Sequence, residues 1–169
     1  MNLNSNRLLI GHFERSDLEQ WFLIESDPEV RKYILDGSIL SREQSLEYID
    51  QNIDSYAKFN FGRYAIREKK SLRLIGMCGF LKTEMGIDFG YRLSKDIWGC
   101  GLGFEAANAV LNYGVDSIGL KHCVAGVMPG NLASIKILDR LGFVYEKDVI
   151  FDGLTSVSYT HLTLPTNDQ

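Results

Sequence analysis

Residues 90–106 read GYRLSKDIWGCGLGFEA, and this segment decides the fold. It begins inside a stretch, residues 86–93, whose alternating apolar residues are typical of a strand. Gly99, Gly101 and Gly103 follow at alternate positions, and apolar residues with helical spacing come after them. A glycine loop between a strand and a helix exposes main-chain N–H groups at the positive end of the helix dipole. The segment therefore predicts an anion-binding site.

Two nucleotide-binding motifs share features with this loop. A P-loop needs Lys followed by Ser or Thr after its last glycine, and neither pair is present here. Gly101-x-Gly103-x-x-Ala106 does match a dinucleotide fingerprint, which should be followed about 20 residues later by an acidic ribose ligand. Residues 121–129 contain no acidic residue. A dinucleotide oxidoreductase is therefore the weaker alternative.

Downstream of the loop, the sequence predicts a strand, a helix and a pair of strands. Residues 122–127 are apolar enough for a strand, and Asn131 is a suitable cap for a helix that ends at Gly142. Two further strands, residues 143–151 and 154–159, flank Asp152 and Gly153, a dipeptide typical of a tight hairpin turn.

Upstream, two helices and three strands are predicted. The strands are residues 7–13, 63–67 and 74–81. The first helix should start at a capping box in residues 16–19, and Pro28 should break or restart it before an irregular stretch. A second capping box, Ser41 with Gln44, opens a helix with one apolar face.

The composition bounds the class of protein. A chain of 169 residues that is 45% hydrophobic can fill one core, and its net charge of -4 without a basic stripe argues against nucleic acid as a partner. No apolar stretch is long enough for a membrane span or a signal core. Three cysteines without a CxxC pair, and three histidines without metal-ligand spacing, predict reduced thiols, no metal and a cytoplasmic protein.

Residues 90–106, together with Asn131-Leu-Ala-Ser134 and Leu141-Gly-Phe143, resemble the GNAT acetyltransferase superfamily, and within it the ribosomal-protein N-terminal acetyltransferases. The resemblance implies an α/β (α+β) fold with helices on both faces of a mixed, mostly antiparallel sheet of six to seven strands. Strands 4 and 5 should splay apart and hold coenzyme A. It implies one domain over residues 1–159. Residues 160–169 depart from the family, so we expect a non-native tail that is disordered beyond about Leu164.

The resemblance also implies which residues bind acetyl-CoA. The loop amides should hold the pyrophosphate, the strand before the loop should hold the pantetheine arm, and Asn131 should contact pantetheine. Cys100 stands where relatives usually have Lys or Arg, so one favourable charge is missing. The loop residues are Trp98, Gly99, Cys100, Gly101, Leu102, Gly103 and Phe104, and the strand residues are Tyr91, Arg92 and Leu93.

Two residues are candidates for catalysis. Asp88 lies where histone-type relatives have a glutamate base, and it is one methylene shorter, so we expect a bridging water; Glu84 and Glu146 are alternatives, and Asp88 can equally be a solvent-facing carboxylate. Leu138 replaces the tyrosine acid of many relatives. Ser134 matches the serine of the ribosomal-protein branch and can donate to the departing thiolate, the alternative being a role in helix capping.

The expected activity is direct transfer of acetyl from acetyl-CoA to a primary amine in a ternary complex. The leading acceptor is a protein N-terminal amine, and a small amine (polyamine, amino sugar or aminoglycoside) is the alternative. A non-catalytic acetyl-CoA sensor is the alternative of another class. A homodimer is left open, and the acceptor loops are expected in residues 28–41, which include Tyr33, and after Phe143.

Overall fold

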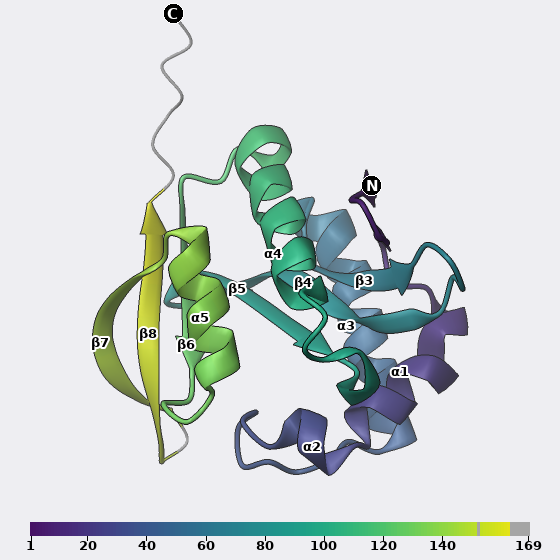
Figure 1. Ribbon diagram of the computed structural model, residues 1–169, viewed down its shortest axis with the longest axis horizontal. Helices are drawn as coiled ribbons and strands as arrows, with labels where there is room; N and C mark the ends of the chain where they lie inside the picture. The colour runs from purple at the N-terminus through teal and green to yellow at the C-terminus, as the bar shows by residue number, and fades with distance from the viewer. Residues whose placement is uncertain (152, 163–169) are drawn as a thin grey trace, which may run out of the picture.

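The computed structural model describes residues 1–151 and 153–162. In this part of the chain, eight strands form one sheet that five α-helices cover (Figure 1). The strands are β1 (Asn2–Asn4), β2 (Leu8–Gly11), β3 (Arg63–Glu68), β4 (Leu74–Thr83), β5 (Gly86–Leu93), β6 (His122–Val127), β7 (Val144–Phe151) and β8 (Leu154–Leu162). The helices are α1 (Leu18–Glu25), α2 (Pro28–Arg31), α3 (Arg42–Phe59), α4 (Leu102–Tyr113) and α5 (Leu132–Leu141), with short turns η1 (Arg15–Asp17), η2 (Lys95–Ile97) and η3 (Gly114–Ile118).

The strand order is β1-β2-β3-β4-β5-β6-β8-β7, and every described neighbour pair is antiparallel except β5 with β6. The mixed, mostly antiparallel sheet is therefore confirmed. Six to seven strands were expected and eight are present. The additional strand is the short β1, which pairs with β2 but contains no apolar run from which it could be predicted. With β1 counted, the expected splay falls between the fifth and sixth strands.

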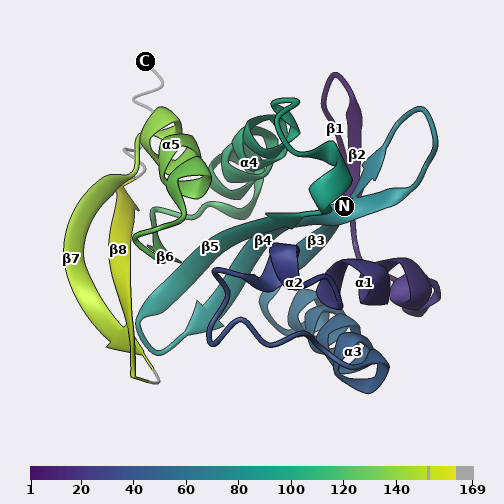
Figure 2. The same cartoon turned by 60° about the horizontal axis from the view of Figure 1, so that its bottom comes forward.

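The helices divide between the two faces of the sheet (Figure 2). The core on the side of α4 includes the buried Phe80, Phe89 and Val110, and the core on the side of α1 and α3 includes Trp21 and Ile49. Successive side chains of a strand point to opposite faces, and β3 and β4 contribute buried residues to both cores. No helix in the described ranges is both long and apolar enough to cross a membrane.

The helix starts agree with the predicted caps at two of three places. Ser41 and Gln44 form the predicted capping box, and the Asn131 side chain accepts a hydrogen bond from the Ser134 N–H. The box predicted in residues 16–19 is wrong. Instead Asp17 accepts from the Glu14 N–H at 2.9 Å, so the box opens two residues earlier, while α1 starts at Leu18, inside the predicted segment. The buried Asp17 also pairs with Arg67 on β3 at 2.6 Å, a tertiary contact that local sequence does not reveal.

The last strand runs past the predicted domain end. Residues 160–162 continue β8 and pair with β6, from Val124 opposite Thr160 to His122 opposite Leu162. The segment that was expected to be foreign therefore begins inside a paired strand. The predicted disorder beyond Leu164, and Asp152 of the predicted turn, lie outside the described residues.

Candidate active site

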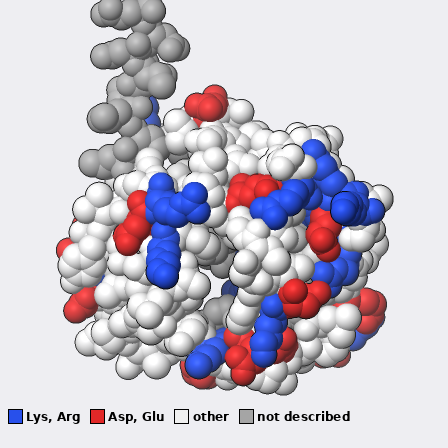
Figure 3. Space-filling model, in the orientation of Figure 1, with Lys and Arg blue, Asp and Glu red and all other residues white. Residues whose placement is uncertain are grey.

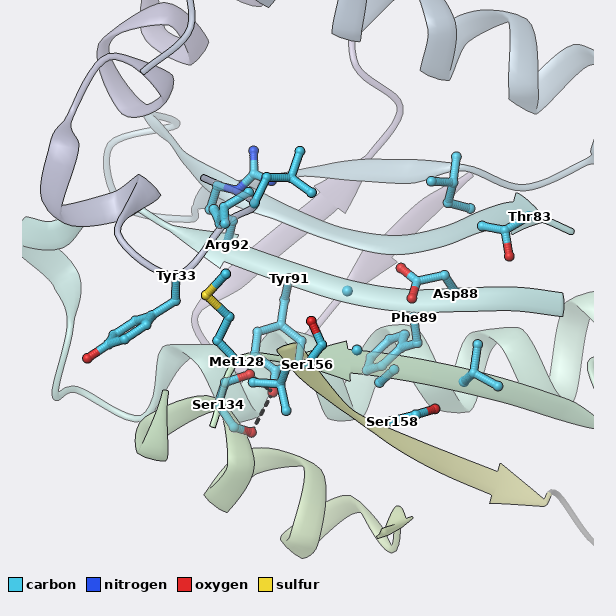
Figure 4. Close-up of a pocket in the computed structure, with 18 of the residues that line it drawn as sticks. Tyr33, Thr83, Asp88, Phe89, Tyr91, Arg92, Met128, Ser134, Ser156 and Ser158 are labelled. Carbon is cyan, nitrogen blue, oxygen red and sulfur yellow. Dashed lines mark hydrogen bonds between the residues drawn. The ribbon is translucent and has the colours of Figure 1, made fainter. Parts of the chain in front are cut away.

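The cleft between β5 and β6 is the centre of the site. These strands pair at one position, Asp88 with Val124, whereas β5 pairs with β4 from Gly86 to Leu93. The edge of β5 that follows Asp88 thus keeps main-chain N–H and C=O groups free for a ligand. A cavity of about 780 Å³ opens there, lined by β5, β6, β8 and the start of α5 (Figure 4), and the surface is hollowed between the two halves of the molecule (Figure 3).

The glycine loop leads directly into α4. Gly99 and Gly101 have φ angles of 78° and 79°, a left-handed conformation that favours glycine. Gly101 is the N-cap of α4 and has no side chain to bond the first N–H groups of the helix. A side chain at Gly99 would meet nothing within 4 Å, so the loop is open. These free amides and the helix dipole fit a diphosphate.

The other glycine and its neighbours have packing roles. A Cβ at Gly103 would lie 3.1 Å from the Cδ1 of Ile137 and 3.4 Å from the Cδ1 of Leu93, so this glycine lets α4 approach α5 and β5. The Leu102 side chain is buried in the core, and Phe104 lies 3.7 Å beneath the Arg140 guanidinium. These residues can offer a ligand main-chain groups, while their side chains support the loop.

Arg7 is a cation beside the loop that the sequence reasoning missed. It comes from the N-terminal end of β2, and its Nη1 donates to the Cys100 carbonyl at 2.9 Å. Its Nε pairs with Glu105 of α4 at 2.8 Å, which fixes the guanidinium against the start of the helix. Arg7 therefore places a guanidinium beside Cys100, although Glu105 already balances its charge. Arg7 is far from Cys100 and Glu105 in the sequence and meets them only in the folded chain, so no local motif could have predicted this contact.

Trp98 closes the turn between β5 and the loop. Its indole Nε1 donates to the Leu93 carbonyl at 2.9 Å, while about half of its side chain stays exposed. One of the β5 carbonyls predicted to face pantetheine thus already has a partner. Tyr91 and Arg92, the two residues before Leu93, lie on the stretch of β5 that does not pair with β6.

Tyr91 and Ser134 bridge the cleft from opposite sides (Figure 4). The Tyr91 hydroxyl donates to the Ser134 carbonyl at 2.8 Å and lies 2.9 Å from the Ser134 Oγ, so the two hydroxyls share a hydrogen bond. Burial raises the pKa of Tyr91, which keeps its hydroxyl protonated at neutral pH. Sequence reasoning gave Tyr91 a main-chain role only. The structure adds a hydroxyl near the start of α5.

The start of α5 also shows what Asn131 and Leu138 do. The Asn131 side-chain oxygen caps the helix through the Ser134 N–H at 3.3 Å, so that oxygen has a structural partner. Leu138 is 1% exposed and part of the core, so it brings no polar group to the cleft. The hydroxyls of Ser134 and Tyr91 can act as donors here instead of the tyrosine that Leu138 replaces.

Asp88 lies where β5 and β6 meet, and it is paired. Its Oδ2 accepts from the Arg63 Nη2 at 2.6 Å, and its carbonyl accepts from the Arg63 Nη1 at 3.0 Å. Burial alone lowers the pKa of Arg63, but the Asp88 carboxylate and other neighbours outweigh it and raise that pKa. Of the alternative bases, Glu84 lines the cavity from the exposed β4–β5 turn. Glu146 is exposed on β7 and is not among the cavity-lining residues.

A buried charge cluster lies on the other side of β5. Glu25 is 0% exposed and pairs with both Arg31, at 3.1 Å, and Arg92. The cluster ties the end of α1 to α2 and to β5. Sequence reasoning named Arg92 for its main chain alone, because nothing in the sequence near residue 92 shows that its side chain meets Glu25.

The structure thus combines a parallel strand pair that opens into a cleft with a glycine-capped helix start beside it, the arrangement expected of a coenzyme A-dependent acyltransferase. Residues 7–144 match the family model described as an acetyltransferase (GNAT) domain. The uncharacterized N-acetyltransferase p20 of Bacillus licheniformis is 33% identical over 147 residues, which cover 85% of this chain and 83% of p20. The chain belongs to the GNAT family and is a GNAT N-acetyltransferase.

Solved structures share the fold. The GNAT acetyltransferase of Bacillus anthracis superimposes with a TM-score of 0.82 at 24% identity, covering 96% of this chain and 98% of that one. RimL, a ribosomal L7/L12 α-N-protein acetyltransferase solved with coenzyme A, gives a TM-score of 0.81 at 15% identity, with 96% and 98% covered. GNAT enzymes use acetyl-CoA and an amine acceptor, which argues against the dinucleotide alternative.

Proposed function

We propose that this enzyme acetylates the N-terminal amine of a protein or peptide. The observation that carries the proposal is the open β5–β6 cleft, which an extended donor arm can enter from the loop side while a peptide enters from the side of α2 and α3. The fold shared with RimL and with the ribosomal-protein-S5-alanine acetyltransferase of Vibrio fischeri supports this acceptor class over a small amine.

In this proposal the loop and β5 bind the donor. The amides of residues 99–104 hold the diphosphate, and Arg7, fixed by Glu105, supports the loop through the Cys100 carbonyl. The Tyr91 main-chain groups and the Leu93 N–H, which face away from β4, pair with the pantetheine amides as a neighbouring strand would, while Arg92 holds this stretch of β5 against β4. The Tyr91 N–H stabilises the oxyanion that forms on the thioester carbonyl, because the Ser94 N–H donates to Ile75 of β4 and the alternation of the ladder turns the Tyr91 N–H toward the cleft. Such a donor is typically worth about 100- to 1000-fold in rate.

Proton transfer then needs a base and a donor for the leaving group. The amine nitrogen attacks the carbonyl carbon, its proton passes through water to Asp88, and the carbon–sulfur bond breaks to release the thiolate. A thiol has a pKa near 8.5, below the raised pKa of Tyr91, so the hydroxyls need not give up a proton. Tyr91 has one hydroxyl proton, which it donates to the Ser134 carbonyl in this structure. When that proton turns to the Ser134 Oγ instead, the serine can donate its own hydrogen bond to the thiolate.

Thiol release from acetyl-CoA, measured on a panel of amines, tests the acceptor class. The panel holds short peptides with free N-termini, the same peptides with blocked N-termini, polyamines, amino sugars and aminoglycosides. We expect release with the free peptides and none with the blocked ones. If a small amine is turned over faster than the peptides, the acceptor is a small amine and the proposed acceptor class is wrong. Binding of acetyl-CoA without release above background would indicate a sensor.

A further inference from the structure

Arg92 has a free edge on its guanidinium. Its Nη1 donates to Glu25, which is the hydrogen bond that this side chain makes among the described residues. Its Nε is buried and has no hydrogen-bond partner there. Buried polar groups nearly always have a partner, so this nitrogen calls for one. In a guanidinium Nε and Nη2 point the same way, and together they form the parallel pair of donors that a carboxylate accepts.

This edge belongs to the acceptor half of the cavity. Arg92 lines the cavity, and its side chain is 12% exposed. Because side chains alternate along a strand, Arg92 lies on the face of β5 opposite to Tyr91 (Figure 4). On that face its guanidinium lies 5.8 Å from the Trp21 ring and 5.9 Å from the Tyr48 ring. Tyr48 also lines the cavity, and its hydroxyl is buried beside the Asn52 side chain without a hydrogen bond of ordinary geometry to the described chain.

The charges behind this edge do not cancel. Glu25 carries one negative charge between two arginines, Arg31 and Arg92, so the buried part of the cluster has one net positive charge; the further carboxylate that acts on Arg31 is the exposed Asp36. Arg63, the other cavity-lining arginine, is already neutralised by Asp88. Glu84 lies at the opposite end of β5, roughly 20 Å from Arg92 at the usual rise per residue. A buried charge without a counterion is costly, so this end of the cavity favours an anion.

We propose that the acceptor carries a carboxylate a few atoms from its amine and that the Nε–Nη2 edge of Arg92 binds it, with the Tyr48 hydroxyl as a second donor. This inference rests on the proposed function and narrows its acceptor. The carboxylate can be the side chain of an acidic residue at the start of a peptide, or the α-carboxylate of a free amino acid. Both sources present a carboxylate to the same edge of Arg92, and a comparison of substrates distinguishes them.

Matched substrate pairs on the native enzyme test the inference without any variant. One pair compares peptides that begin with Asp or Glu against the same peptides with Asn or Gln. The other compares free amino acids against their amides. We expect kcat/KM to be about 10- to 100-fold higher for the carboxylate member of one pair, chiefly through KM, as for loss of a charge-assisted hydrogen bond. The pair that shows the preference identifies the source.

Variants then assign the preference to Arg92. Arg92→Lys keeps the charge but lacks the parallel donors, so the ratio of kcat/KM between the carboxylate and the carboxamide member should fall below about threefold, whatever the change in overall rate. Arg15→Gln removes an exposed arginine that pairs with Asp50, and it should keep the full preference. Equal rates for both members of each pair on the native enzyme would overturn the inference, because the edge would then only pack against Trp21 and Tyr48. No acetylation of any amine would instead overturn the proposed function and the inference with it.

Discussion

At the scale of single residues, the shared hydrogen bond between Tyr91 and Ser134 gives the first prediction. Ser134→Ala and Tyr91→Phe each remove one hydroxyl, and each should lower kcat by about 10- to 100-fold, the range for a hydrogen bond to a charged group. The double variant should lose little more than the worse single variant, because both act through one donor. Steady-state kinetics measures this, with acetyl-CoA affinity as the control.

The pH dependence of the same pair has a defined sign. Burial raises the pKa of Tyr91 above its ordinary value near 10, so the hydroxyl is protonated at every pH below that value. Tyr91 should therefore cause no fall in kcat between pH 7 and 9. The pH profiles of the native enzyme and of Tyr91→Phe should have the same shape in that range. A falling limb in that range that disappears in Tyr91→Phe would contradict the assignment of Tyr91 as a neutral donor.

Asp88 gives the second residue prediction. If it accepts the amine proton, Asp88→Asn should lower kcat by about 100- to 10,000-fold and remove the acidic limb of the pH profile. The same change breaks the ion pair with the buried Arg63, so thermal unfolding must be followed in parallel. A variant that is less stable yet keeps its kcat and its acidic limb would show that Asp88 serves the ion pair alone.

The sequence predicted the types of group at the site better than their partners. It placed a carboxylate and a hydroxyl at Asp88 and Ser134, and the structure puts both in the lining of one cavity. It could not predict Arg63 beside Asp88, since the two are separated in sequence and meet only across the sheet. The side-chain roles of Tyr91 and Arg92 were missed for the same reason.

At the scale of elements, the glycine loop can be tested against a matched glycine elsewhere. Gly101 and Gly119 have φ angles of 79° and 81°, and both end or begin a helical segment. Alanine at either position should cost about 1 to 2 kcal/mol in stability because of the left-handed backbone. Only Gly101→Ala should also weaken acetyl-CoA binding, because it alone disturbs the amides that begin α4.

Two measurements on both variants separate the loss of stability from the loss of acetyl-CoA affinity: thermal unfolding and equilibrium binding of acetyl-CoA. A similar loss of affinity in Gly119→Ala would mean that general destabilisation explains the result. Unchanged affinity in Gly101→Ala, at the same loss of stability, would remove the loop from the coenzyme site.

Element boundaries were predictable where one local signal dominates. The strand over residues 86–93 and the helix that begins after Asn131 agree with the structure because alternation and a capping side chain act locally. The first helix starts inside the predicted segment, but its capping box was misplaced because Asp17 closes the box with Glu14 and pairs with Arg67 on β3. Strand β1 was missed because pairing with β2, rather than its own residues, makes it a strand.

At the scale of the whole molecule, ligand binding should stabilise the fold. Acetyl-CoA at about 100 times its Kd should add about 2.7 kcal/mol to the free energy of unfolding, and raise Tm by roughly 5 to 10 °C for a chain of this size. NAD at the same concentration should leave Tm unchanged. Stabilisation by NAD rather than acetyl-CoA would contradict the placement of a coenzyme A diphosphate at the start of α4.

The most direct test is a crystal structure of the protein with acetyl-CoA. The account predicts diphosphate oxygens within hydrogen-bond distance of main-chain nitrogens in residues 99–104, and a pantetheine arm that pairs with β5 and brings the thioester into the β5–β6 cleft. A diphosphate bound elsewhere, or a cleft filled by side chains while the coenzyme is bound, would contradict it.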